Sequence, residues 1–344
     1  MSIPTQLFCK SDTDIPAAYA IIRGMRTRSS TDYRISVTMG DPAGIGPEIV
    51  LGALQDQGIS RRCNPVIVGH LPTLQHCART VGLPLPDCRI ISVDTPGIER
   101  VKPGRISTEA GIAADAYIRK ACEMAKSGEI DAICTAPINK ESLRLAGVKG
   151  TGHTEMLADY LGSSDPLTLF VTGRLWIFFL SRHLSLRNAI EFVTKERVLE
   201  MIKRVDAAIR ELGFEKPNIG LAALNPHASD GGQFGDEEAV HLVPAVEEAR
   251  RAGITVFGPI GADSVFSQAL EGKFDCVISL YHDQGHIAAK TRDFYGTVTA
   301  TLGLPVLRTS VDHGTAMDIA WQGKANDFSM RAAILAACDL LESK

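Results

Sequence analysis

No stretch of about 18 consecutive apolar residues occurs in the sequence, which argues against a transmembrane helix. No block of basic residues occurs either, because 36 Lys and Arg stand against 40 Asp and Glu and the net charge is -4. Proteins that bind nucleic acid or an anionic membrane surface usually carry a basic patch. We therefore expect no nucleic acid and no membrane as a partner, and a small molecule as the ligand.

The eight cysteines include no CxxC pair. Disulfide frameworks and cysteine zinc sites both depend on characteristic cysteine spacings. Several cysteines, such as Cys134 and Cys276, stand inside apolar runs. Reduced thiols in a cytoplasmic protein are therefore predicted. Residues 1–33 lack the basic start that is typical of a signal peptide and are expected to form an N-terminal extension.

The composition, with 45% hydrophobic and 22% charged residues, is typical of a soluble folded protein, and a length of 344 residues favours two domains. From Tyr33 onward, β-rich runs alternate with amphipathic segments. Residues 195–212 predict a helix because their apolar positions recur on one helical face. This alternation predicts an α/β fold. The expected strands lie at 34–40, 64–69, 130–137, 175–181, 218–224, 255–259 and 274–280.

Three of the nine histidines share one position relative to the expected strands. His183, His227 and His282 each follow the predicted C-terminal end of a strand, which is where α/β sheets bind ligands. Three imidazoles can hold one divalent ion and leave open positions for a substrate. The alternative is that each is a surface or capping histidine. His286 is a weaker ligand candidate, because a turn is predicted around Gly285.

Other polar groups follow the same kind of segment. The sequence GHTE offers the imidazole of His153 and the hydroxyl of Thr154. Lys290 and Arg308 are two cations downstream of the third histidine, and together they could hold a phosphate and a carboxylate. Ordinary surface charge is the alternative, since most Lys and Arg side chains are solvated.

Six segments occur in the order MGDPAGIGPE, GHTE, NPHASDGGQFGDEE, GADSVF, YHDQGH and GLPVLRTSVDHGTAMDIA. From Arg34 to the C-terminus, the chain thereby resembles the 4-hydroxythreonine-4-phosphate dehydrogenase family, which includes 4-phospho-D-threonate and 4-phospho-D-erythronate dehydrogenases. The resemblance implies a two-domain isocitrate/isopropylmalate-dehydrogenase-like α/β fold with an inter-domain cleft. It also implies a homodimer whose subunits share active sites. The expected domains are 34–145 plus 305–344, and 146–304.

The resemblance also implies roles for individual residues. A divalent metal ion, such as zinc, magnesium or cobalt, is expected on His183, His227 and His282, with one ligand from the partner subunit. Proton transfer is expected from Lys290 or His153. The substrate contacts are expected from His153, Thr154, Asp263, Lys290, Thr299 and Arg308, and the NAD contacts from His313, Gly314 and Asp318.

One of these positions departs from the family pattern. Two residues before the Thr of TLGLP, where the family usually has Asn, this chain has Thr299. A hydroxyl has a shorter reach than an amide and one donor in place of two. The substrate contact at Thr299 is therefore expected to differ from that of the family.

The implied reaction is NAD-dependent and metal-dependent oxidation, with decarboxylation, of a 4-phosphorylated 3-hydroxy four-carbon acid of the 4-phospho-D-threonate or 4-phospho-D-erythronate type. One alternative is the 4-phosphohydroxy-L-threonine dehydrogenase of pyridoxal phosphate biosynthesis, whose substrate carries an amine at C2. A phosphate acyltransferase of the same broad fold would not need three metal-binding histidines. A non-catalytic metal-binding protein would not need Lys290 and Arg308 beside the metal.

Overall fold

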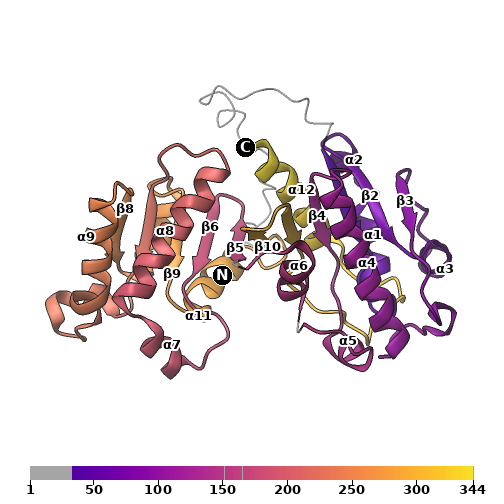
Figure 1. Cartoon of the computed structure of the whole chain (residues 1–344), viewed down its shortest axis with the longest axis horizontal. Helices are drawn as coiled ribbons and strands as arrows, with labels where there is room; N and C mark the ends of the chain where they lie inside the picture. The colour runs from indigo at the N-terminus through magenta and orange to yellow at the C-terminus, as the bar shows by residue number, and fades with distance from the viewer. Residues whose placement is uncertain (1–32, 151, 165, 344) are drawn as a thin grey trace, which may run out of the picture.

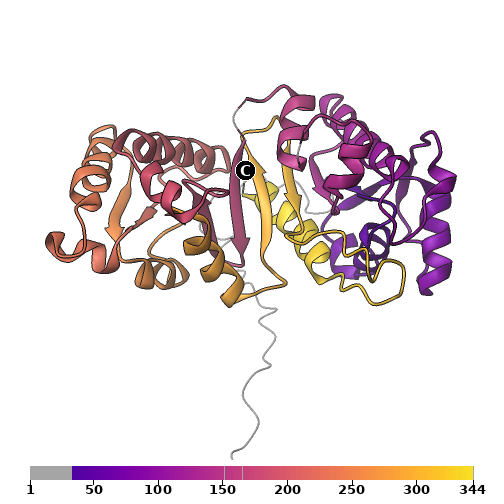
Figure 2. The same cartoon turned by 90° about the horizontal axis from the view of Figure 1, so that it is seen from below.

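The computed structural model describes residues 33–150, 152–164 and 166–343. The expected N-terminal extension lies outside the described residues, apart from Tyr33. The described chain forms an 11-stranded mixed sheet with helices packed against it, and Figures 1 and 2 show an elongated molecule. The predicted α/β class is therefore confirmed.

The strand order across the sheet is β3-β2-β1-β4-β11-β10-β5-β6-β9-β7-β8. All seven expected strands are present, but the sequence analysis missed β3, β5, β10 and β11. The strands are β1 (Arg34–Thr38), β2 (Asn64–Gly69), β3 (Arg89–Ser92), β4 (Ala132–Thr135), β5 (Leu167–Thr172), β6 (Leu175–Phe179), β7 (Ile219–Ala222), β8 (Val256–Ile260), β9 (Cys276–Ser279), β10 (Val298–Leu302) and β11 (Leu307–Ser310).

Strand direction divides the sheet into two parallel sets. Strands β1, β2, β3, β4 and β11 run parallel to one another, and so do β6, β7, β8 and β9. The two sets are joined by β10, which is antiparallel to β11 and β5, and by β5, which is antiparallel to β6. The strands of the two expected domains occupy the two halves of this sheet, and the domain boundaries themselves stay a prediction.

The helices cover the sheet, with α12 between the two halves in Figure 1. The helix predicted at 195–212 is α8, and the apolar residues that define its predicted face are all buried, namely Val198, Leu199, Ile202, Val205 and Ile209. The helices are α1 (Gly46–Ala53), α2 (Gln57–Ser60), α3 (Leu71–Val81), α4 (Thr108–Lys126), α5 (Lys140–Leu145), α6 (His153–Leu161), α7 (Leu186–Phe192), α8 (Lys195–Glu211), α9 (Val243–Arg251), α10 (Ala262–Leu270), α11 (His282–Arg292) and α12 (Phe328–Glu342), with the 3-10 helices η3 (Ile98–Arg100) and η4 (Pro226–Gly232) and the π-helix η5 (Glu238–Leu242).

The cysteines of the described chain are free, and most of them are buried. Cys134 and Cys276 lie in the core, as predicted, and burial raises the pKa of both thiols. Cys9 lies outside the described residues. Among the described helices, none is both long and apolar enough to span a membrane.

Helix α11 begins at His282, so the turn predicted around Gly285 is wrong. Gly285 serves close packing instead, because an added Cβ would come within 2.5 Å of Phe179 Cε1 and 2.7 Å of Ser279 Oγ. The missing side chain allows α11 to lie directly on β6 and β9. His282 and His286, four residues apart on this helix, consequently stack with ring centroids 3.6 Å apart.

We expect Gly285→Ala to lower the free energy of unfolding by about 1–3 kcal/mol, the usual cost of overpacking a tightly filled interior. Denaturant unfolding would measure the change. Thr291→Ala on the same helix is the matched control, since Thr291 is exposed and its replacement should change stability by less than about 0.5 kcal/mol. Equal stability of the two variants would contradict the packing role of Gly285.

Candidate active site

A pocket of about 300 Å³ lies over the middle of the sheet. Its floor includes Thr135, Ser310, Thr299 and Phe170, from β4, β11, β10 and β5. Ser310 is in register with Thr135 and Thr299, and Thr299 is in register with Phe170. Residues in register on neighbouring strands point to the same face of a sheet. These four side chains therefore form a row across the junction of the two halves.

A second row on the same face lies two residues away along each strand. Thr301 is in register with Arg308 on one side and with Thr168 on the other. The intervening Thr309 points to the opposite face, where its hydroxyl donates to the carbonyl of Ala333 in α12 at 2.8 Å. This alternation directs Arg308 to the pocket face.

Arg308 is only 4% exposed. Its guanidinium donates to Thr135 Oγ1 at 2.8 and 3.2 Å and to Thr301 Oγ1 at 3.3 Å. Burial lowers the pKa of Arg308 to about 10, so the group stays charged at neutral pH. No carboxylate of the described residues forms an ion pair with it. Because a buried charge without a counter-charge is costly, an anionic ligand is the fitting partner for this guanidinium.

His153 is the first residue of α6 and lines the same pocket. Its Nε2 atom is buried and has no hydrogen-bond partner in the described structure. Burial, followed by the positive charge of Arg308, lowers the pKa of His153 well below its usual value. A neutral imidazole therefore faces the ligand space, with Thr154 beside it.

The lowered pKa of His153 predicts a pH dependence of stability. An unfolded histidine takes up a proton near pH 6.5, whereas the native imidazole resists protonation, so stability should fall as the pH drops below about 6.5. The contribution of one such group is at most about 1.4 kcal/mol per pH unit. We expect His153→Gln to flatten the slope of unfolding free energy between pH 5 and about 6.5. Identical slopes in the variant and the wild type would contradict the assignment.

Two of the three metal candidates lie close together. His183 follows β6 and His282 follows β9, and their ring centroids are 6.3 Å apart. The carboxylate of Asp283 lies 2.6 Å from His282 Nδ1, which leaves His282 Nε2 for another partner. Carboxylates often orient metal-binding imidazoles in this way. The imidazoles of His183 and His282 are therefore suited to supply two of the ligands of a divalent ion.

His227 does not complete a three-ligand group with this pair in the described chain. It occupies η4, after β7, and its side chain is exposed. In the part of the chain that the structure describes, no group of three His, Cys, Asp or Glu side chains is placed to hold a metal ion. One chain therefore does not gather the three expected ligands.

Comparison with known proteins places this geometry in a family. A family model described as "Pyridoxal phosphate biosynthetic protein PdxA" matches residues 61–337. The chain belongs to this family.

A PdxA-like fold is also found in solved structures of 4-hydroxythreonine-4-phosphate dehydrogenases. The structure from Klebsiella pneumoniae has a TM-score of 0.84 and 38% identity, and it covers 90% of this chain and 100% of its own. The structure from Burkholderia phymatum has a TM-score of 0.80 and 37% identity, with coverages of 90% and 98%.

Relatives by sequence carry a more specific name. A protein of Clostridium botulinum named "Putative D-threonate 4-phosphate dehydrogenase" is 48% identical over 318 residues, which cover 88% of this chain and 95% of that protein. A protein of Halalkalibacterium halodurans with the same name is 47% identical over 315 residues, with coverages of 87% and 94%. The resemblance to the 4-hydroxythreonine-4-phosphate dehydrogenase family is thereby confirmed.

The remaining predicted residues of this PdxA family member differ in their distance from the pocket. Lys290 Nζ lies 2.5 Å from Asp312 Oδ2, and Asp312 lines the pocket, so this pair reaches its rim. His313 lines the pocket as well. Three predicted residues are exposed and lie outside the pocket lining, namely Asp263 on α10 and Gly314 and Asp318 after β11.

The sequence analysis missed several polar residues of the pocket. Arg182 adjoins His183 in the segment after β6, and its position at a strand end was a signal that could have identified it. His286, which the sequence offered only as a weaker metal ligand, lines the pocket because α11 continues through Gly285. Thr168 and Thr135 carried no comparable signal, since a buried threonine in a strand is common.

Proposed function

We propose that the chain is an NAD-dependent dehydrogenase that oxidises the 3-hydroxyl of a 4-phosphorylated four-carbon acid of the D-threonate 4-phosphate type, with decarboxylation of the product. The observation that carries the proposal is the buried guanidinium of Arg308, without a carboxylate partner in the described chain, in a pocket shared with the neutral His153. The names of the Clostridium botulinum and Halalkalibacterium halodurans relatives support this substrate class.

The two anionic groups of such a substrate match the cations of the site. Arg308 binds the phosphate, since its planar guanidinium suits phosphate oxygens and its charge has no other ionic partner among the described residues. Lys290 exchanges Asp312 for the substrate carboxylate at the pocket rim. Thr154 and Thr299 line the pocket and bind hydroxyl or phosphate oxygens.

The metal and the nicotinamide are expected in neighbouring positions. His183 and His282 would hold a divalent ion together with His227 of a second copy, and the loop with His313, Gly314 and Asp318 would hold NAD. When bound, the ion supplies Lewis-acid chemistry that lowers the pKa of the 3-hydroxyl, and NAD supplies the hydride acceptor.

Proton transfer falls to the chain itself. The C3 hydrogen leaves as hydride, and the hydroxyl proton passes to His153 Nε2, the buried nitrogen that has no partner in the described structure. Lys290 binds the carboxylate as an ammonium, which cannot accept a further proton. Oxidation at C3 gives a β-keto acid, which loses its carboxylate as carbon dioxide. The ammonium of Lys290 stabilises the negative charge that develops on the enolate oxygen.

A panel of substrates tests this proposal. The panel holds D-threonate 4-phosphate, D-erythronate 4-phosphate, 4-phosphohydroxy-L-threonine and unphosphorylated D-threonate, each with NAD and a divalent metal ion. We expect reduction of NAD with the phosphorylated hydroxy acids and little with D-threonate. Acyl transfer between acetyl phosphate and coenzyme A, without reduction of NAD by any acid, would favour the phosphate acyltransferase instead.

The proposed homodimer with shared sites predicts complementation between inactive chains. His183→Ala and His227→Ala should each be inactive alone. If His183 and His227 of one site come from different subunits, mixing the two variants with subunit exchange assembles one intact site per mixed dimer. Half of the molecules would be mixed dimers at random exchange, so roughly a quarter of the wild-type activity should return. No recovery after exchange is verified by mass would contradict shared sites.

A further inference from the structure

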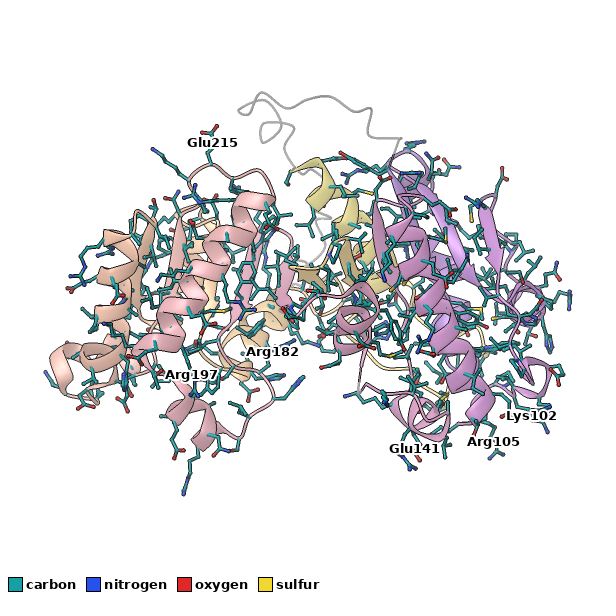
Figure 3. All side chains as sticks on the ribbon, in the orientation of Figure 1. Lys102, Arg105, Glu141, Arg182, Arg197 and Glu215 are labelled. Atoms are coloured by element: carbon teal, nitrogen blue, oxygen red, sulfur yellow. The ribbon has the colours of Figure 1, made fainter. Side chains whose placement is uncertain are left out.

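Arg182 is a second guanidinium of the pocket, and none of the roles above uses it. Its side chain is half-buried, and it donates to Thr168 Oγ1 at 2.5 Å. It lines the pocket next to His183. In Figure 3, Arg182 lies near the middle of the molecule, on the side that faces the junction of the two halves, whereas Arg197 lies farther out.

The sheet places Arg182 and Arg308 on neighbouring hydroxyls. Arg182 donates to Thr168, and Arg308 donates to Thr301. Thr168 and Thr301 are in register on β5 and β10. Because side chains opposite each other on neighbouring strands lie about 5 Å apart, the two guanidiniums are fixed at adjoining points of one face of the sheet.

The described pocket lining offers little negative charge to balance these cations. Asp312 is the one acidic residue of that lining, and it already pairs with Lys290. Glu155, in the first turn of α6, is exposed and lies outside the lining. Its charge acts on Arg182 and Arg308 at longer range, but it forms no ion pair with either in the described chain. Within the described lining, a substrate ammonium would therefore meet Arg182, Arg308 and Lys140, and the one carboxylate there is already paired.

We propose that Arg182 sets the specificity of the site at substrate C2, by favouring a hydroxyl and excluding an ammonium. A hydroxyl at C2 can accept a hydrogen bond from the guanidinium, which is a donor only. An ammonium is also a donor only, so it gains no hydrogen bond there and is repelled by the like charge. This inference rests on the proposed function, and it selects the phosphorylated sugar acid over 4-phosphohydroxy-L-threonine.

The test compares the two acids in matched variants. Arg182→Gln removes the charge and keeps a polar side chain, Arg182→Lys keeps the charge, and Arg197→Gln removes an exposed arginine charge from α8. For each protein, kcat/KM is measured with D-threonate 4-phosphate and with 4-phosphohydroxy-L-threonine. The dissociation constants of both acids are measured by calorimetry in the absence of NAD.

We expect the wild type to prefer the hydroxy acid, and Arg182→Gln to reduce that preference at least tenfold, in kcat/KM and in the dissociation constants. Arg182→Lys should keep most of the preference, and Arg197→Gln should keep all of it. A wild-type preference for the amino acid, or an unchanged preference in Arg182→Gln, would overturn the proposal.

The two proposals fail in different ways. If the wild type reduces NAD with neither acid, the proposed dehydrogenase function fails, and the dissociation constants decide the role of Arg182. If the wild type oxidises the hydroxy acid and Arg182→Gln keeps the full preference, the function stands and the role of Arg182 fails. Binding of neither acid to the wild type would overturn both.

Discussion

Arg308→Ala is expected to lower kcat/KM for the phosphorylated acid by roughly 30- to 1000-fold, which corresponds to a loss of about 2–4 kcal/mol of transition-state binding. The guanidinium is buried and held by Thr135 and Thr301, so it is positioned before the substrate arrives. Without it, the phosphate would lose the buried charged partner that Thr135 and Thr301 hold in place. The variant should therefore lose most of its preference for the phosphorylated over the unphosphorylated acid.

Steady-state kinetics with both acids would measure this loss, and thermal unfolding would show whether the variant is folded. Arg308→Lys is the matched comparison, because it keeps the charge but has no planar pair of donors. It should retain more activity than Arg308→Ala. Wild-type kcat/KM and full preference for the phosphate ester in Arg308→Ala would remove the phosphate assignment.

The second large effect concerns the metal. His183→Ala and His282→Ala should each weaken the binding of a divalent ion by more than about 100-fold, since even the loss of a group that orients a ligand costs 10- to 100-fold. Asp283→Asn should fall in that smaller range, because the Asp283 carboxylate contacts His282 Nδ1. Competition with a chelator would measure the affinity without any turnover.

His241→Ala is a matched control for this series. His241 belongs to η5, outside the pocket, and its replacement should leave the metal affinity unchanged. Full metal occupancy in a His183, His227 and His282 triple alanine variant would contradict the proposed metal site. Unchanged affinity in Asp283→Asn, with the site otherwise intact, would contradict only the orienting role of the carboxylate.

The sequence predicted the parts of the fold whose patterns are local. Strands such as β7 and β9 are apolar runs between turn residues, and α8 repeats its apolar positions with helical period. Strands β5, β10 and β11 carry buried threonines and the buried Arg308, because one face of each contributes to the pocket. Their polar side chains obscured the apolar pattern that marks a buried strand.

The same physical reason limits what the sequence could predict about the site. The strand-end argument selected His183 and His282, and the structure brings their rings together. It did not extend to the neighbouring Arg182, whose place beside Arg308 follows from the pairing of β5 with β10. Gly285 suggested a turn, although its small size serves the contact of α11 with the sheet. The position of Arg182 and the packing of Gly285 both depend on contacts between segments that are distant in the sequence.

The most direct measurement is a parallel count of two products from purified protein, NAD, a divalent metal ion and D-threonate 4-phosphate labelled at C1. We predict reduced NAD and labelled carbon dioxide in a one-to-one ratio, with both signals lost on chelation of the metal and strongly reduced for unphosphorylated D-threonate. If the protein forms neither product from this acid, while Arg308 and His153 remain intact and the chain is folded, the proposed function is wrong.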